Sequence, residues 1–219
     1  MLAATSNPAV GDCAQPLHLL VAPSGKFLYA ANHGDPSGPE YCVYSIDPGS
    51  GALAAIPRSP FTFRQNSEPW GLAFGSGGSL LYSTLSNAEG VDGLSVDTGS
   101  GALSELSGSP YSAGFIPQGL AIGGNGKYLY AGNEGDGSIS IYKIDQTTGV
   151  LTANGSLAAG NPSFLAVSPS GQYLFALGQD TRQLSVYSID STSGNLSRVT
   201  STTVSGGTNL PALAVVGLN

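Results

Sequence analysis

The sequence predicts an all-β protein made of one four-stranded unit repeated along the chain, and three observations support this fold class. A segment of about 49 residues recurs four times, and a fifth copy begins near the C-terminus. Short apolar or alternating runs are separated by turns rich in Gly, Pro and Asp, and no segment shows the 3.6-residue period of a helix. A fixed period of about 40 to 50 residues indicates one supersecondary unit stacked repeatedly.

A proline opens the first apolar run of each copy. These prolines are Pro16, Pro69, Pro117 and Pro162, which are 53, 48 and 45 residues apart, and Leu210 takes the equivalent place in the fifth copy. The predicted repeats therefore span about 16–68, 69–116, 117–161 and 162–209, with a partial copy at 210–219. All of them belong to a single predicted domain, residues 1–219.

The copy that starts at Pro162 has the clearest strand pattern. Residues 164–168 form a short apolar run that is typical of a strand buried on both faces. A Pro-Ser-Gly turn at 169–171 leads to a second strand at 172–177. A polar loop precedes an alternating third strand at 184–189, and after a turn at 190–194 an outer fourth strand follows at 195–199.

An aspartate opens the turn before the fourth strand in every repeat, and a glycine closes it. The four turns run over 47–51, 97–101, 145–149 and 190–194. Four carboxylates in register could suggest calcium ligands, but we favour a structural explanation. Aspartate caps its own turn through an Asx hydrogen bond, and glycine takes the left-handed position.

The composition excludes several classes of function. The net charge is −7 and the seven Lys and Arg residues are scattered, which argues against nucleic acid or an anionic membrane as a partner. No run approaches the roughly 18 apolar residues of a membrane helix. The sequence contains no zinc-spaced His/Cys cluster, P-loop or dinucleotide fingerprint, so we expect no metal and no cofactor.

The N-terminal residues and the cysteines leave the cellular compartment open. Residues 1–8 lack the basic and apolar regions of a signal peptide. Two cysteines are too few for a disulfide framework. Cys13 precedes the first strand and Cys42 lies in a later strand of the same repeat, so one bridge is conceivable, but we favour two separate buried thiols.

Four-stranded antiparallel units at this period indicate the blades of a β-propeller. The pattern P-x-x-L-A-V-x-P-x-G-x-x-L-Y-A-x-N, followed by V-Y-x-I-D-x-x-[ST]-G-x-L, resembles the seven-bladed lactonase-type propellers, the family of bacterial 6-phosphogluconolactonases. Residues 16–32 and 127–133 carry this resemblance best, and it covers nearly the whole chain. It implies lactone hydrolysis, although related propellers include proteins without known catalysis.

The repeats do not complete a ring. Residues 1–10 resemble the end of an outer strand and residues 211–216 an inner strand, so about 18 strands are present, whereas seven blades need about 28. We therefore expect an open arc of four complete blades with a leading outer strand and a trailing inner strand, as in an N-terminally truncated member. Its unpaired sheet edges invite pairing with another chain.

The resemblance and the repeat pattern select six candidate site residues. His18 is the third residue of its inner strand, where the other copies have Gly71, Gly119, Phe164 and Ala212, and P-x-H-x-x-x-x-P-x-G fits the family at 16–25. His18 is the candidate base for a lactone-opening water, and the alternative is a packed channel histidine.

The other five candidates lie in loops on the same predicted face. Glu68 or Glu134 would orient the base or the water, and Arg64 or Arg182 would bind negative charge on a small-molecule substrate. For His33 we favour simple solvent exposure, and contact with the substrate is the alternative. Arg64 and Glu68 could instead form a loop ion pair, and Trp70 is assigned to the core in preference to a stacking platform.

Two functions remain open from the sequence. One is a lactonase-like hydrolase of the 6-phosphogluconolactonase type, and the other is a non-catalytic propeller that binds a protein or a small molecule. Sparse basic groups favour the second for this chain taken alone, and the family resemblance favours the first.

Overall fold

The computed structural model describes residues 13, 15–33, 40–123 and 125–205. Within them lie four antiparallel sheets, and a fifth short strand, β9, adds to the second sheet. The first sheet contains β1 (Pro16–Val21), β2 (Phe27–Asn32), β3 (Tyr41–Ile46) and β4 (Leu53–Ala55). The second contains β5 (Pro69–Phe74), β6 (Leu80–Leu85), β7 (Gly90–Val96), β8 (Leu103–Glu105) and β9 (Tyr111–Ser112).

The third and fourth sheets repeat the same order of strands. The third contains β10 (Pro117–Gly123), β11 (Tyr128–Asn133), β12 (Ser138–Ile144) and β13 (Leu151–Ala158). The fourth contains β14 (Phe164–Val167), β15 (Tyr173–Leu177), β16 (Gln183–Ile189) and β17 (Leu196–Thr203). One short 3-10 turn, Ser76–Gly78, is the only helical element among the described residues, and none there is long and apolar enough to cross a membrane.

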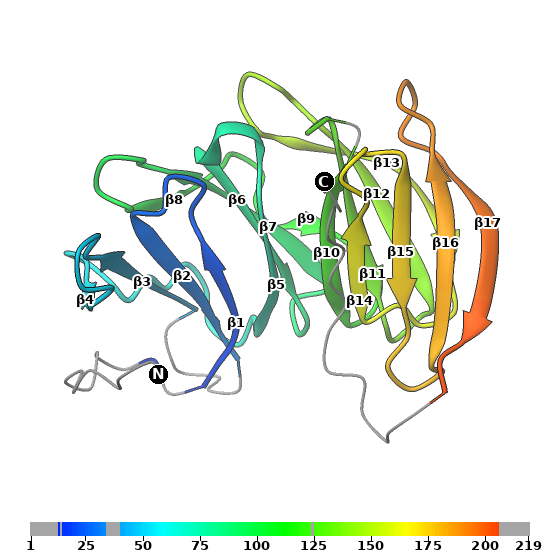
Figure 1. The fold of residues 1–219 in the computed structure, drawn as a ribbon, viewed down its shortest axis with the longest axis horizontal. Helices are drawn as coiled ribbons and strands as arrows, with labels where there is room; N and C mark the ends of the chain where they lie inside the picture. The colour runs from blue at the N-terminus through cyan, green and yellow to red at the C-terminus, as the bar shows by residue number, and fades with distance from the viewer. Residues whose placement is uncertain (1–12, 14, 34–39, 124, 206–219) are drawn as a thin grey trace.

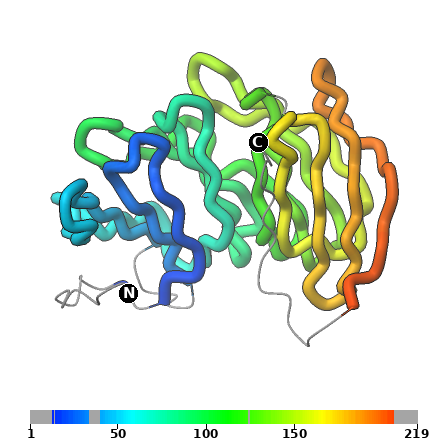
Figure 2. Tube along the Cα trace, in the orientation of Figure 1, coloured from blue at the N-terminus to red at the C-terminus, as the bar shows by residue number. Residues whose placement is uncertain are grey.

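The four sheets follow one another in chain order as the blades of an open propeller arc (Figures 1 and 2). The first strands of neighbouring blades lie side by side, β1 with β5, β5 with β10 and β10 with β14. These are the inner strands, and β4 and β17 lie at the two ends of the arc in Figure 1. The predicted all-β blade architecture is therefore confirmed. The expected strands at 1–10 and 211–216 lie outside the described residues.

The turn before each fourth strand forms as predicted. In every repeat one carboxylate oxygen of the aspartate accepts hydrogen bonds from the backbone N–H groups two and three residues later. The closing glycines all have φ between 72° and 80°. One oxygen of each aspartate is thus engaged by its own turn, as expected for a structural role.

A tyrosine in the second strand joins each blade to the next one. The hydroxyl of Tyr29 donates to the carbonyl of Gly101 (3.0 Å), and Tyr82 and Tyr130 make the same bond to Gly149 (2.7 Å) and Gly194 (3.0 Å). The acceptors are the closing glycines of the aspartate turns in the following blade. In the fourth blade the equivalent residue is Phe175, which has no hydroxyl.

The core consists of apolar layers between consecutive blades. One layer joins Tyr29 and Val43 of the first blade to Leu72 and Leu81 of the second. Two further layers lie between the second and third blades and between the third and fourth. Burial against a neighbour stabilises each blade, because a single four-stranded sheet cannot cover both of its own faces.

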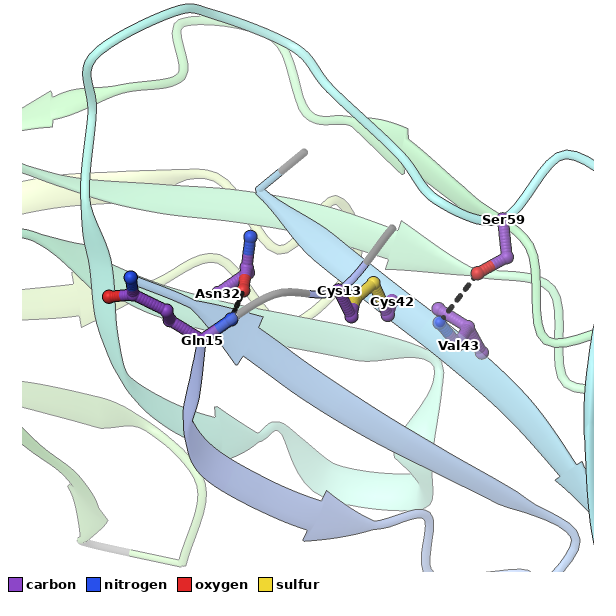
Figure 3. The surroundings of a disulfide bond; sticks show 6 residues. All are labelled: Cys13, Gln15, Asn32, Cys42, Val43 and Ser59. Atoms are coloured by element: carbon purple, nitrogen blue, oxygen red, sulfur yellow. Dashed lines mark hydrogen bonds between the residues drawn. A yellow bond between two sulfur atoms is a disulfide. The ribbon is translucent and has the colours of Figure 1, made fainter. Parts of the chain in front are cut away.

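The two cysteines form a disulfide, which corrects our preference for separate thiols (Figure 3). Cys13 and Cys42 have Cα atoms 6.3 Å apart, so the segment before β1 is tied to the start of β3. Beside this bridge, the backbone N–H of Gln15 donates to the side-chain oxygen of Asn32 (2.8 Å). The covalent bond and the hydrogen bond together fix the entry to the first inner strand.

Candidate functional site

A cavity of about 230 Å³ lies where the four inner strands begin. Counted from the proline that opens each repeat, its walls come from the second and third residues, together with two leucines from the fourth position. The lining residues are Leu17, His18, Trp70, Gly71, Gln118, Gly119, Leu120, Ser163, Phe164 and Leu165. The residues that align with His18 at the third position, Gly71, Gly119 and Phe164, are thus part of the wall. The fifth such residue, Ala212, lies outside the described residues.

β-Bulges bring the second-position residues into this wall. Strand pairing with the neighbouring second strand shifts directly after Pro16, Pro69 and Pro117. A bulge leaves a residue out of the ladder and re-aims its side chain. Trp70 and Gln118 lie in these bulges, whereas Ser163 stands immediately before β14.

Gly71 allows two inner strands to approach closely. A Cβ atom at this position would lie 2.5 Å from the carbonyl oxygen of Gln118, so no larger residue fits without a backbone shift. Thr84 fixes the same contact, because its hydroxyl accepts from the N–H of Gly71 (2.9 Å) and donates to that carbonyl (2.7 Å). The backbone of Gln118 is therefore firmly positioned.

Gln118 itself was missed by the sequence reasoning. Its side chain is only 7% exposed, and its Oε1 atom is buried without a hydrogen-bond partner among the described residues. A buried acceptor without a donor costs about 1 to 3 kcal/mol. Such a group on a cavity wall is consistent with a ligand that supplies the donor.

His18 is half-buried and faces the backbone of β5. Its Nδ1 atom accepts a hydrogen bond from the N–H of Leu72 (3.3 Å). Burial lowers the pKa of His18 below its ordinary value of 6.5, against the raising effect of a backbone hydrogen bond at Trp70. The ring is accordingly neutral near pH 7, and with Nδ1 as the acceptor from Leu72 the ring proton is assigned to Nε2.

Glu134 is connected to the cavity through Ser163. The Ser163 hydroxyl donates to a carboxylate oxygen of Glu134 (3.0 Å) and accepts from the N–H of Gln179 (3.2 Å). The Asn161 amide donates to the Glu134 carbonyl (2.8 Å), which orders the loop after β11. Ser163 is a second lining residue that the sequence reasoning did not select.

Glu68 and His33 form a pair behind Trp70. The His33 Nε2 atom is 3.3 Å from a carboxylate oxygen of Glu68, and both side chains are about three-quarters buried. The His33 ring meets Trp70 edge to face with a centroid separation of 4.8 Å. Trp70 therefore lines the cavity on one side and supports the pair on the other, where we had assigned it to the core.

Arg64 lies in a carboxylate cluster away from the cavity lining. It pairs with Asp92, Glu105 and Glu40, of which Asp92 and Glu40 are almost fully buried. The alternative of a loop ion pair between Arg64 and Glu68 is therefore wrong, since each has other partners. Because three carboxylates already pair with its guanidinium, the structure gives no support to Arg64 as a substrate-binding group.

Arg182 also lies outside the cavity lining. Its φ is 53°, in the left-handed region, and its carbonyl accepts from the N–H of Val204 (2.8 Å). Of the six candidates only His18 lies in the cavity wall. Glu134 is hydrogen-bonded to the lining residue Ser163, His33 contacts the lining residue Trp70, and Glu68 contacts His33. Within the described residues, no group of three or more His, Cys, Asp or Glu side chains could hold a metal ion.

Comparison with known proteins assigns the family. The family model described as "Lactonase, 7-bladed beta-propeller" matches residues 4–115 and 117–210. The chain belongs to this family. Sequence comparison with curated proteins gave no match.

Solved structures agree with the lactonase-family fold. A candidate 6-phosphogluconolactonase from Bacteroides fragilis is 24% identical with a TM-score of 0.75, covering 91% of this chain and 58% of that chain. Another from Bacteroides uniformis is 22% identical with a TM-score of 0.77, covering 90% and 59%. The periplasmic gluconolactonase of Pseudomonas aeruginosa is 24% identical with a TM-score of 0.74, covering 86% and 54%.

These identities support a common fold and nothing finer. The chain spans less than three-fifths of the length of each of the three structures. This partial coverage agrees with the open arc of four blades.

Proposed function

We propose that this lactonase-family propeller binds a small cyclic ester in the cavity at the inner strands and hydrolyses it. The observation that carries the proposal is the gathering of His18, Gln118 and the Ser163–Glu134 pair at one cavity. Hydrolysis needs a base for water and a donor for the carbonyl oxygen as it becomes negative. Family membership and the cavity chemistry support this reaction class together.

The tautomer of His18 changes the role that we assigned to it. Because Nδ1 accepts from the Leu72 N–H, the remaining ring nitrogen is a donor and not a free base. The neutral imidazole would therefore donate from Nε2 to the carbonyl oxygen of the ester. Donors of this kind contribute about 10² to 10³ in rate when they are pre-positioned.

Glu134 is the better candidate for the base. In the proposed step a water proton passes to the Ser163 hydroxyl as that hydroxyl gives its own proton to the Glu134 carboxylate, while the water oxygen bonds to the carbonyl carbon. The ring C–O bond then breaks, and its oxygen takes the proton back from Glu134 through the Ser163 hydroxyl, which yields the open hydroxy acid. Glu68 and His33 support the Trp70 wall and take no part in the proton transfer.

A non-catalytic binding function is the second candidate, and one observation favours it. The lone pair on Nδ1 of His18 and the guanidinium of Arg64 are both used within the protein. The cavity would then hold a small molecule without supplying complete catalytic machinery. The same propeller scaffold is compatible with both functions.

Hydrolysis assays separate the two candidates. We expect the chain to open a six-membered sugar lactone faster than the buffer blank, measured as acid release at constant pH. His18→Ala and Glu134→Gln should each lower kcat by about 10²-fold, whereas Glu89→Gln, at an exposed loop position, should not. Wild-type rates equal to the blank would reject hydrolysis, and unchanged rates in both variants would remove these residues from the mechanism.

A further inference from the structure

We propose that the cavity selects an uncharged, polyhydroxylated ring ester over the phosphorylated form of the same ring. This inference rests on the proposed function and specifies its substrate class. It is notable because two of the structurally similar proteins bear names that refer to a 6-phospho substrate.

The polar groups of the wall match hydroxyl groups. Gln118 Oε1 needs an O–H or N–H donor, since no described residue supplies one. His18, whose Nδ1 accepts from the Leu72 N–H, presents Nε2–H as a donor. A sugar hydroxyl both donates and accepts, and a lactone carbonyl accepts, so one ring can satisfy both groups.

The size and the apolar part of the wall match a single ring. The volume of about 230 Å³ is below the roughly 300 to 1,000 Å³ that is typical of pockets for drug-sized ligands. Trp70 and Phe164 add aromatic surface to the cavity. The C–H face of a sugar ring can pack against aromatic side chains while its hydroxyls reach the polar groups.

The charges connected to the wall are negative. Glu134 is one hydrogen bond behind Ser163, and Glu68 is held by His33 behind Trp70. Arg64, which could have offset them, is already surrounded by Asp92, Glu40 and Glu105. A phosphate dianion normally needs several converging basic groups, and the described residues that line this cavity include none. It would instead meet like charge.

Trp70 provides a direct readout, because it is the only tryptophan of the chain and lines the cavity. The experiment titrates the full chain with glucono-δ-lactam, a ring that does not hydrolyse readily, and with its 6-phosphate, while Trp70 fluorescence is recorded. We expect saturable binding of the neutral lactam and at least tenfold weaker binding of the 6-phosphate at low salt. Added salt should narrow the gap, because it screens repulsion between like charges.

Matched charge variants identify the source of the selectivity. Glu134→Gln removes the negative charge that is hydrogen-bonded to Ser163 and keeps an acceptor for it, so it should reduce the preference for the neutral lactam at least threefold. Asp47→Asn removes one charge from an exposed turn between β3 and β4 and keeps the Asx acceptor. It should leave the preference unchanged.

The outcomes distinguish this inference from the proposed hydrolysis. Binding of the 6-phosphate as tight as that of the neutral lactam, or binding of neither, overturns the inference. Binding of the neutral lactam without any lactone hydrolysis supports the inference and removes the hydrolase proposal. Faster hydrolysis of the phosphorylated lactone overturns the inference and leaves the hydrolase proposal in place.

Discussion

Gln118 shows how a single residue can be unfavourable for the fold and useful for binding. Its carboxamide oxygen is buried without a described partner, on the wall of the cavity. Removing an unsatisfied acceptor while keeping the side-chain volume should not destabilise the protein. The same change should remove a contact to the ligand.

We therefore predict opposite effects of Gln118→Met on stability and on binding. The free energy of unfolding should stay constant or rise by about 1 kcal/mol, and the affinity for glucono-δ-lactam should fall at least tenfold. Gln146→Met is the control, because the Gln146 amide donates to the carbonyls of Gly126 and Ile144 and its loss should cost stability. Urea unfolding and Trp70 fluorescence measure both quantities, and a clear stability loss in Gln118→Met would contradict the assignment.

His18 and Gln118 also show what the sequence could reveal at this scale. His18 was selected as a candidate because aligning the repeats at their opening prolines places it beside the third residues of the other inner strands. Gln118 lies in the bulge after Pro117, and Ser163, at the same place in its repeat, precedes the first residue of β14. Bulge positions depend on tertiary packing and leave no clear mark in the pattern of apolar residues.

The interface between the first two blades depends on one cation among several carboxylates. Arg64 precedes β5, and its partner Asp92 lies in β7 and also accepts from the Tyr41 hydroxyl of β3 (2.6 Å). Glu40 accepts from the backbone N–H groups of Phe63 (2.5 Å) and Arg64 (3.0 Å). Burial raises the pKa of Glu40 in spite of these bonds and of the Ser67 hydroxyl.

We predict that Arg64→Met destabilises the protein by about 3 kcal/mol or more, because buried carboxylates lose their counter-charge. The deficit should shrink as the pH falls. A carboxyl whose folded-state pKa is raised favours the folded state below that pKa, and removing the cation raises it further. Urea unfolding at pH 7.5 and pH 5 tests both effects.

Arg58→Met is the control for this variant. Arg58 is exposed and also has a positive φ, so its replacement should change stability by no more than about 0.5 kcal/mol. Equal stability of the two variants, or a deficit in Arg64→Met that does not change with pH, would contradict the role given to the cluster.

The strands and turns of each blade were predictable because their signals are local. The Asp-to-Gly turns formed at all four expected positions, and the strands expected after Pro162 agree with β14 to β17 within a few residues. The pairing of Cys13 with Cys42 was not predictable, since it depends on how the entering segment crosses the first blade. The carboxylate cluster likewise joins residues of two blades that no local pattern connects.

The side of the first blade that faces away from the second blade resembles the surface by which the other blades pack against a preceding blade. Leu19 of β1 is 56% exposed, whereas the equivalent Leu72, Leu120 and Leu165 are at most 8% exposed against a preceding blade. Within the described residues, the Gly51 carbonyl also lacks the tyrosine donor that its counterparts in the other three blades have. Pairing of this end with another chain remains a prediction.

The repeat allowed the architecture to be predicted for the whole molecule, but the site only in part. The period gave the blade count and the direction of each strand, because every blade repeats the same local pattern. Which loops meet at the cavity depends on the packing angle between blades. Arg64 and Arg182 were chosen from loops of the predicted face, and neither belongs to the cavity lining.

The central claim is that four inner strands enclose one cavity whose unsatisfied acceptor, Gln118, receives a ligand. A crystal structure of the full chain grown with glucono-δ-lactam tests it most directly. We predict density for the ring between Trp70 and Phe164, with a ring hydroxyl or N–H within hydrogen-bond distance of Gln118 Oε1. A cavity closed by its own side chains, or lactam bound only elsewhere, would contradict the claim.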